Sequence, residues 1–445
     1  MVGFRVNKYI SERSAPMKSY AETWEKIFGI RRTRRIFIAA TRQNVGKTTV
    51  SLGLIATLRN RFKKMGFIKP VGQRYMLEKG YKVDEDSVLI ERIFKFKFPL
   101  HDMSPVAVER GYTERFLDGK GTLNAVTSIR ESFSRVAEDK DFVIIEGTGH
   151  AGVGSVFDLS NAAVAKMLNS KVILVAPGGI GNPIDEVMLN KSLFDSKGVK
   201  LAGVVVNKVM PHKYDKVNKY VRKGLNRLGI PVLGVMPYVE LLDIPTMRDL
   251  REELDMHVLC GEKYLYKQMR KVLVGAMDVR EASQYIEDDC LVITPGNRGD
   301  LINLLIKVHT GRLKGPNRIA GLILSGGHTP KRRIYNTLKK TDIPTLMSRF
   351  NTYDVASRVH DLTVKIKSRD ENKVKMVIDM IEKYVDVERI IRDIGQKKRH
   401  EARHLHIFRR HFIIRLFADR KRRRLFPHCG AHGHVRAGQG RRAGA

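Results

Sequence analysis

The stretch from Arg35 to Leu54, RIFIAATRQNVGKTTVSLGL, decides the fold of the first part of this chain. RIFIAA is a short apolar run typical of a buried parallel strand, and the residues after Lys47 place apolar side chains at helical spacing. A Gly-Lys-Thr turn stands between the two runs. Strand, turn and helix in this order predict a phosphate-binding loop, because the backbone amides at the start of the helix point toward an anion.

The loop predicts a nucleotide site that holds ATP with Mg²⁺. Lys47 supplies a mobile cation near the β- and γ-phosphates, and the Thr48 hydroxyl can hold Mg²⁺. The loop residues that we expect to contact the nucleotide are Thr41, Asn44, Val45, Gly46, Lys47, Thr48 and Thr49. The pattern G-x-x-x-x-G-K-[ST] begins with Gly, whereas this chain has Thr41 there, so a fortuitous Gly-Lys-Thr turn is the alternative.

Strand-like runs recur after the loop, with helical patterns between several of them. The runs lie at 66–69, 142–146, 171–176, 201–207 and 231–235, and the helical patterns at 121–137, 158–169, 183–196 and 214–228. This alternation predicts an α/β domain over 35–249, with a parallel sheet covered by helices on both faces. Ligands of such sheets bind at the carboxyl ends of the strands.

Charged side chains stand at the ends of two of these strands. Glu146 follows the run FVII, where an acid is costly without a partner, and beside a phosphate loop it can bind Mg²⁺ or orient a nucleophile. Lys69 ends the run GFIK and could face an anionic substrate. Farther along the chain, Asp84 and Asp86 are carboxylates suited to a second metal contact, with a solvated loop as the alternative.

Six segments of this domain resemble dethiobiotin synthetase and the related cobyrinic acid a,c-diamide synthase group of P-loop proteins. They are ATRQNVGKTTVSLGL, GFIKPVG, VIIEGTGH, APGGIGNPIDEV, GVVVNKV and GIPVLGVMPY, and the resemblance extends over about 35–240. The phosphate loop of that group often has its first Gly one residue earlier, where this chain has Ala40.

The resemblance implies a role for each matching residue. Lys47 and Thr48 match the phosphate and Mg²⁺ positions, and Glu146 and Asp86 match the metal contacts of the group. Lys69 matches a lysine that contacts the substrate and the transition state. The implied catalytic residues are therefore Lys47 and Lys69.

The resemblance also implies how the rest of the site is built. Asn207 matches an adenine-reading asparagine, and Pro237 lies near the loop that closes on the base. Sites of the group often lie near a homodimer interface, so we expect a homodimer. The synthetase follows its K-P-V motif with small residues, whereas this chain has the bulkier and more basic Gly72-Gln73-Arg74-Tyr75, and we do not expect a diamino fatty acid substrate.

Segment 250–390 has a βα pattern of its own and predicts a second, smaller α/β domain. Its strand-like runs lie at 272–277, 288–300, 318–328 and 343–348, and its helical patterns at 300–309, 330–340, 352–361 and 371–384. Gly-rich ends follow two of these strands, in PGNRGD and SGGH. Such ends favour backbone contact with an anionic ligand, and a pair of tight strand-to-helix turns is the alternative.

About 255–365 resembles the DRTGG domain, which joins the same P-loop module in the N-terminal region of some phosphate acetyltransferases. The D-R-T motif appears as Asn297-Arg298-Gly299-Asp300, and LSGGH (324–328) and FNTYDVASRV (350–359) match later turns. The resemblance implies a regulatory role. The acetyltransferase catalytic domain has no match in the chain, so we do not expect acyl transfer from acetyl phosphate.

The net charge of +35 first suggests a nucleic-acid partner. Segment 396–445 holds 15 of the 82 Lys and Arg against two acids, a net +13. We predict a polar N-terminal extension over 1–34 and a basic, disordered tail over 391–445, and expect nucleic acid only at the tail. Three cysteines exclude a disulfide framework and no run approaches about 18 apolar residues, so we expect a cytoplasmic protein without a membrane span.

Together these patterns predict an ATP-binding P-loop protein, a Mg²⁺-dependent ATPase related to synthetases that activate a carboxylate or carbamate with ATP. The partner that they imply is a small anionic substrate or effector. The competing class is a regulatory or scaffold module whose nucleotide state changes its contacts, and the lack of a recognisable substrate pocket favours it. A third class binds nucleic acid through the tail, with a steep salt dependence.

Overall fold

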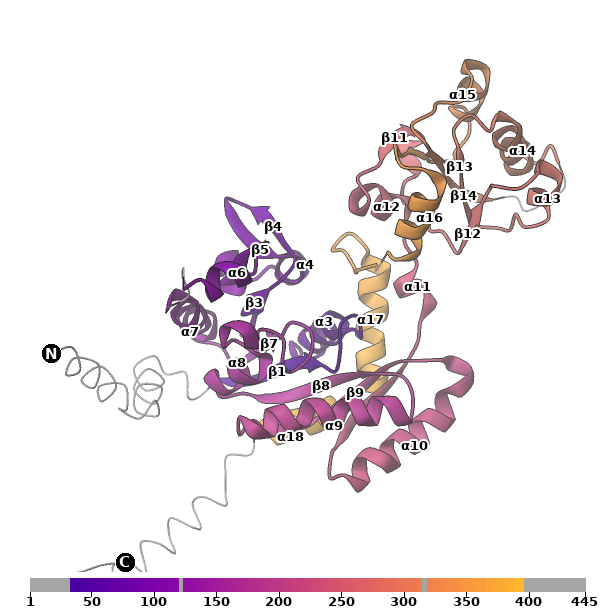
Figure 1. Ribbon diagram of the computed structural model, residues 1–445. Helices are drawn as coiled ribbons and strands as arrows, with labels where there is room; N and C mark the ends of the chain where they lie inside the picture. The colour runs from indigo at the N-terminus through magenta and orange to yellow at the C-terminus, as the bar shows by residue number, and fades with distance from the viewer. Residues whose placement is uncertain (1–32, 120–122, 314–317, 363, 396–445) are drawn as a thin grey trace, which may run out of the picture. The chain divides into compact units, whose positions relative to one another are not determined.

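The structure is a computed structural model that describes residues 33–119, 123–313, 318–362 and 364–395 (Figure 1). The extension predicted over 1–34 and the tail predicted over 391–445 lie almost entirely outside these residues. In the described part of the chain, no helix combines the length and the apolar character that a membrane span needs. Two cysteines are described, Cys260 and Cys290, and both are buried free thiols.

The six strands predicted for the first domain form one parallel sheet in the order β10-β9-β8-β1-β7-β2. They are β1 (Arg34–Ala40), β2 (Met65–Ile68), β7 (Phe142–Glu146), β8 (Lys171–Pro177), β9 (Leu201–Val209) and β10 (Val232–Pro237). Strand β1 lies between β7 and β8, with Ile38 opposite Glu146 and Ala40 opposite Val175. The loop after β1 therefore starts beside the carboxyl ends of both neighbours.

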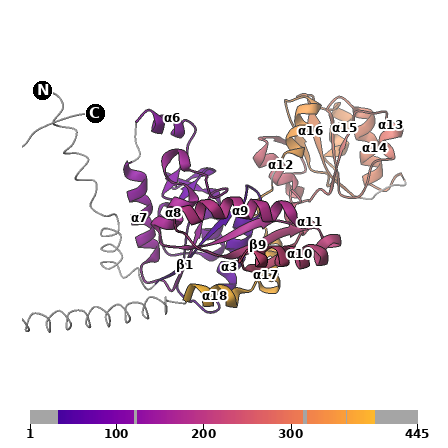
Figure 2. The same cartoon turned by 60° about the horizontal axis from the view of Figure 1, so that its bottom comes forward.

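Helices cover both faces of this sheet (Figures 1 and 2). Apolar side chains from four helices share one core with the sheet; these are α7 (Leu123–Ala137), α8 (Asn161–Met167), α9 (Gly181–Ser196) and α10 (Tyr214–Arg227). Helix α3 (Lys47–Leu58) packs against β1 and β7 with side chains outside that core, from the other face. The α/β class and the covered parallel sheet are confirmed.

Short elements that the sequence does not predict fill the chain between β2 and β7. They are β3 (Val71–Gly72), β4 (Tyr75–Glu78), β5 (Tyr81–Asp84), β6 (Val106–Ala107), α4 (Glu85–Phe94), α5 (Leu100–Met103) and α6 (Tyr112–Leu117). Asp84 caps α4, because its carboxylate accepts a hydrogen bond from the amide of Asp86 at 3.0 Å. The two acids are therefore fixed side by side at a helix start, and they are not in a solvated loop.

The second domain contains a five-stranded sheet in the order β11-β15-β14-β13-β12, in which β12 to β15 are parallel. The strands are β11 (His257–Cys260), β12 (Lys271–Val274), β13 (Cys290–Pro295), β14 (Ile319–Ser325) and β15 (Thr345–Met347). Helix α11 (Glu240–Asp243) precedes this domain in the sequence. The α-helices that follow it in the domain are α12 (Met247–Glu253), α13 (Val279–Ser283), α14 (Gly299–His309), α15 (Arg332–Leu338) and α16 (Thr352–His360). The four predicted strands are present, and the unpredicted β11 pairs antiparallel with β15.

The helix after the second domain packs on the first (Figure 1). Helix α17 (Glu371–Tyr384), which is followed by α18 (Val387–Gly395), lies against α3 and β10. The approach to α3 is close because Gly53 has no side chain, and a Cβ there would lie 2.2 Å from Cγ1 of Ile381. Val385 forms a bridge with Gly234 of β10. The chain thus leaves the first domain after β10 and returns to it at α17.

Candidate functional site

The phosphate loop is held in place by a buried asparagine on β9. Gly46, the residue before α3, has a φ of 100°, and no side chain caps the helix. Nδ2 of Asn207 donates to the carbonyl oxygen of Val45 at 2.9 Å, and a Cβ on Gly46 would lie 2.3 Å from the same nitrogen. Because the first amides of a helix have no partner within it, the uncapped start of α3 can bind an anion.

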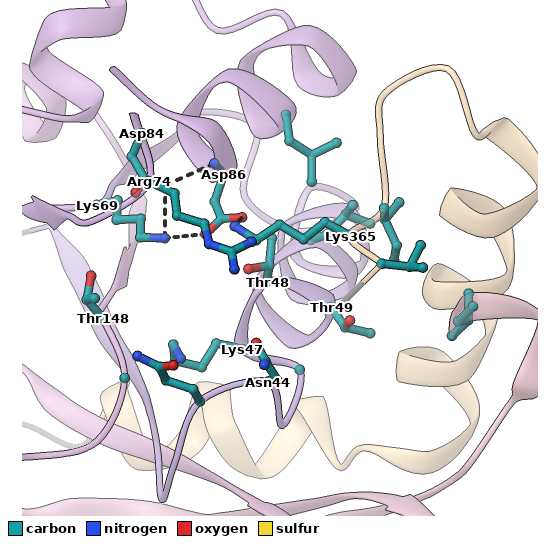
Figure 3. A pocket seen from close by; sticks show the side chains of 18 of the residues that line it. Asn44, Lys47, Thr48, Thr49, Lys69, Arg74, Asp84, Asp86, Thr148 and Lys365 are labelled. Carbon is teal, nitrogen blue, oxygen red and sulfur yellow. Dashed lines mark hydrogen bonds and ion pairs between the residues drawn. The ribbon is translucent and has the colours of Figure 1, made fainter. Parts of the chain in front are cut away.

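Three buried carboxylates and a buried lysine lie beside this loop, and Figure 3 shows two of the carboxylates, Asp84 and Asp86, with Lys69. We call Asp84, Asp86 and Glu146 the carboxylate cluster; each is 5% exposed or less. Nζ of Lys69 lies 2.9 Å from Oδ1 of Asp84 and 3.7 Å from Oε1 of Glu146, and it donates a hydrogen bond to Asp86. The structure thus brings together Lys69 and Glu146, which the sequence places at strand ends, and the two acids farther along the chain, Asp84 and Asp86.

The lysine and the carboxylate cluster fix each other's charge. Burial acts to lower the pKa of Lys69, but Asp86, Asp84 and Glu146 together outweigh it and hold that pKa above its ordinary value. Burial acts to raise the pKa of Asp86, and Lys69 and Lys365 reverse this and hold it below the ordinary range. The pKa of Glu146 is raised, mainly by burial. The arrangement therefore favours the protonated form of Lys69 and the ionised form of Asp86.

The chemistry of these donors fits Mg²⁺. The Thr48 hydroxyl donates to Oε1 of Glu146 at 3.0 Å, while Oε2 of Glu146 and Oδ2 of Asp84 are buried without a hydrogen-bond partner. A buried carboxylate oxygen left unpaired is costly. Mg²⁺ takes one or two carboxylates and completes its shell with phosphates and waters. Within the described residues, no three His, Cys, Asp or Glu side chains are placed to hold a metal ion.

Lys47, at the end of the phosphate loop, is the second cation of the site after Lys69. Burial lowers its pKa to about 8, more than the nearby Glu146 can offset. No hydrogen bond or ion pair of its side chain is recorded within the described ranges, unlike that of Lys69. A desolvated ammonium that forms no ion pair is suited to receive a phosphate.

A pocket joins the loop to the carboxylate cluster (Figure 3). Seven of the predicted site residues line it: Asn44, Gly46, Lys47, Thr48, Thr49, Lys69 and Asp86. Five others do not: Thr41, Val45, Glu146, Asn207 and Pro237. Of these, Thr41 donates its hydroxyl to Glu186 at 2.6 Å, and Glu146 lies buried behind Thr48.

Both polar atoms of the Asn207 side chain form hydrogen bonds within the protein. Its Nδ2 donates to Val45, and its Oδ1 accepts from the amide of Lys208 at 2.8 Å. In this arrangement it supports the phosphate loop. The predicted adenine contacts of Asn207 and Pro237 therefore stay predictions.

Several pocket residues were missed by the sequence reasoning. They are Gln43, Leu52, Leu89, Lys208, Leu242, Asp243, Val364, Lys365 and Ile366. Gln73 and Arg74, which the sequence resemblance singles out after the K-P-V motif, also line the pocket. Nζ of Lys208, on β9, lies 2.9 Å from Oδ2 of Asp243, on α11. Lys365 lies 279 positions from Asp86 in the sequence and bonds to it, so no local pattern could have found it.

The Gly-rich strand ends of the second domain use their polar groups internally. Nε of Arg298 donates to Asp300 at 3.0 Å, and its terminal nitrogens donate to backbone carbonyls of Gly275 and Met277. The amides of Gly326 and Gly327 donate to backbone carbonyls at 2.7 and 2.9 Å. Of the two readings of these ends, the geometry favours tight strand-to-helix turns over an anion site.

The sequence matches known families over both domains. A family model described as an AAA domain matches residues 34–246, and the DRTGG domain model matches 249–362. The phosphate acetyltransferase of Pseudomonas putida is 29% identical over 365 residues, which cover 79% of this chain and 50% of that protein. The phosphate acetyltransferase of Nitratidesulfovibrio vulgaris is 26% identical over 371 residues, covering 80% and 51%. The chain spans about half the length of these curated relatives.

Two solved structures are similar at a lower level. The MinC:MinD cell division protein complex of Aquifex aeolicus is 16% identical, with a TM-score of 0.30 over 47% of this chain and 84% of that chain. The CBS and DRTGG domains of the regulatory region of Clostridium perfringens pyrophosphatase are 19% identical, with a TM-score of 0.22 over 31% and 60%. By its family matches, the chain carries a P-loop domain of the AAA type followed by a DRTGG domain.

Proposed function

We propose that this chain binds ATP with Mg²⁺ in the pocket between the phosphate loop and the carboxylate cluster, and hydrolyses it slowly in the absence of an acceptor. The observation that carries the proposal is the pair formed by Thr48 and Glu146 at the open start of α3, with one buried carboxylate oxygen left unpaired. A hydroxyl and a carboxylate beside free helix amides suit a cation bridged to phosphates.

The residues divide the work as follows. The amides of α3 and the ammonium of Lys47 bind the β- and γ-phosphates, and Thr48 with Glu146 and Asp86 would hold Mg²⁺. Mg²⁺, when bound, neutralises phosphate charge. Lys69 stays protonated because the carboxylate cluster holds its pKa high, so it stabilises negative charge and does not act as a base.

The proposed activity is ATP-dependent activation of a carboxylate or carbamate, as in the dethiobiotin synthetase-like group. An oxygen of the acceptor attacks the γ-phosphorus, the bond from that phosphorus to the β–γ bridging oxygen breaks, and ADP leaves with the electron pair. Lys47 and Lys69 offset the charge of the transferring group. Arg74, which is exposed and lines the pocket, supplies a further cation for the anionic acceptor.

Calorimetry on Lys47→Ala tests the proposal. We expect ATP binding in the presence of Mg²⁺ to weaken by about two orders of magnitude, the scale of a lost charge-assisted contact. Lys375→Ala, which removes a charge from an exposed position of α17, should bind as the wild type does. Equal binding by Lys47→Ala and the wild type would remove the phosphate loop from the proposal.

A turnover assay then separates two functions. With ATP alone we expect slow hydrolysis, and a screen of carboxylates and carbamates should find one that accelerates ADP release. The second candidate is a nucleotide-responsive regulatory module, favoured by the entry of Lys365, from the chain after the second domain, into the same pocket. It predicts nucleotide binding with no acceptor in the screen. Fast hydrolysis without any acceptor argues against the synthetase-like reading.

Several finer assignments belong to this proposal. We place the first domain at 35–249 with the later addition of α17, because α17 packs on α3 and β10. A homodimer and a cytoplasmic location stay expectations, which light scattering and fractionation test. Nucleic-acid binding through the tail predicts a salt-dependent affinity that disappears on removal of 396–445.

A further inference from the structure

Lys365, which follows the second domain in the sequence, bonds to Asp86 of the carboxylate cluster (Figure 3). We call residues 364–370 the return segment, because they lead from the second domain back to α17. Nζ of Lys365 lies 3.2 Å from Oδ1 of Asp86 and 3.3 Å from Oε2 of Glu85. The return segment thus adds a cation to a site that is otherwise built by the first domain.

Lys365 and Lys69 between them take both oxygens of Asp86. Lys69 bonds to Oδ2 and Lys365 to Oδ1. A cation that binds Asp86 directly must therefore displace one of the two lysines. Lys69 is fully enclosed and also paired with Asp84, whereas the side chain of Lys365 is 31% exposed and Glu85 offers it a second partner near the surface.

We propose that Lys365 is an internal competitor of Mg²⁺: it holds Asp86 in the nucleotide-free site and leaves when the metal–nucleotide complex binds. The inference rests on the proposed function, since it needs a nucleotide with its metal in this pocket. The charge balance supports it, because Mg²⁺ and the Lys365 ammonium both neutralise Asp86 and are close enough to repel each other.

The rest of the return segment connects Lys365 to the second domain through salt bridges. Lys367 donates to Glu252 at 2.7 Å, and Arg369 contacts Glu252 at 2.9 Å and Asp249 at 3.2 Å. Glu252 and Asp249 belong to α12, whose residues Met247 and Leu250 pack in the core of the second domain.

The other end of the return segment is fixed. Lys373, which is buried, donates to the carbonyl oxygens of Leu242 and Ile244 at 3.3 and 2.8 Å. Motion of the segment is therefore confined between this anchor and the second domain. The identity of the cation paired with Asp86 is in this way linked to the salt bridges between the return segment and α12.

Calorimetry with MgADP, and with ADP in excess EDTA, tests the competition without turnover. We expect Lys365→Ala to bind MgADP about three- to tenfold more tightly than the wild type, the range for loss of a partly exposed ion pair. Metal-free ADP should bind no more tightly. Lys365→Arg and the exposed control Lys375→Ala should stay close to the wild type.

Hydrogen exchange supplies a readout independent of affinity. The amides of 364–370 should exchange faster when MgADP binds to the wild type, and Lys365→Ala should already show the faster exchange without ligand. Weaker MgADP binding by Lys365→Ala would make Lys365 a phosphate contact and overturn the competition, and so would unchanged binding. Failure of the wild type to bind MgADP at all would overturn the proposed function as well.

Discussion

The two largest sheets in the described part of the chain differ at the carboxyl ends of their parallel strands. In the first, the carboxyl ends of β2 and β7 lead into buried charges, and two buried carboxylate oxygens stay without a hydrogen-bond partner. In the second, the ends of β13 and β14 lead into glycine turns whose amides, and whose Arg298, bond to neighbouring segments of the same domain. Both ends look similar in sequence, as Gly-rich and charged residues after an apolar strand.

The two sheets thus differ in how far the polar groups at their strand ends are satisfied: incompletely beside the pocket of the first, and by hydrogen bonds in the second. The first sheet tolerates the cost of a buried, incompletely paired cluster, and a bound cation and phosphates would lower that cost. The polar groups at the strand ends of the second sheet find partners within their own domain, so no bound ion is required to satisfy them. Four predictions follow from this contrast, from the largest expected effect to the smallest.

Lys69→Ala should cause the largest loss of stability. It leaves Asp84, Asp86 and Glu146 buried with their main counter-charge removed, and breaking a buried pair in this way costs about 3–5 kcal/mol. Urea unfolding followed by circular dichroism measures the change. A loss below about 1 kcal/mol, the range of exposed ion pairs, would show that the cluster is not as closed as described.

Nucleotide affinity should fall above pH 8. The pKa of Lys47 is about 8 because burial lowers it, and the phosphates bind the protonated form. The ATP dissociation constant should therefore be flat below pH 8 and rise about tenfold per pH unit above it, until the pKa of the bound form is reached. Lys47→Arg, which stays charged, should lose this inflection. An inflection that survives in Lys47→Arg belongs to another group.

Gly53→Ala should separate α17 from α3. The new methyl group would meet Ile381, so we expect a loss of about 1–3 kcal/mol from overpacking. The double variant Gly53→Ala, Ile381→Ala should recover part of the loss in the same unfolding experiment. An additive double variant would mean that the two residues do not touch, and the return segment would then lack its support.

Arg298→Ala should have the smallest effect. Its partner Asp300 lies in the same turn, and Gly275 and Met277 lie just after β12; a partly exposed ion pair contributes about 1 kcal/mol or less. We expect a small fall in stability and no change in ATP binding by calorimetry. A large loss of nucleotide affinity would give the second sheet a ligand-binding edge and end the contrast between the two sheets.

Much of the fold was predictable because strands buried on both faces are continuous apolar runs. RIFIAA and FVIIE became β1 and β7 for this reason. The hairpin of β4 and β5 was not predictable, since Tyr75, Leu77 and Tyr81 are exposed and carry no pattern of burial. The helix of 371–384 was predicted, but periodicity gives a helix its apolar face and does not say which domain that face meets.

The site was predictable where chemistry follows the chain closely. Lys47 and Thr48 begin the helix that follows β1 and its loop, and Glu146 ends β7, so the strand ends place them together. Asp86 needed the cap on α4 to be positioned, and Lys365 needed the return of the chain after a whole domain. Contacts between residues so far apart in sequence are set by tertiary packing, which no local pattern encodes.

The entry and exit of the second domain lie next to each other. Arg369 contacts Asp249, and Lys373 contacts the carbonyls of Leu242 and Ile244. A domain whose two ends meet can be exchanged for another of different size without moving the residues on either side. In evolutionary terms, this junction would let the P-loop domain gain, lose or exchange the second domain while its own sheet stays unchanged.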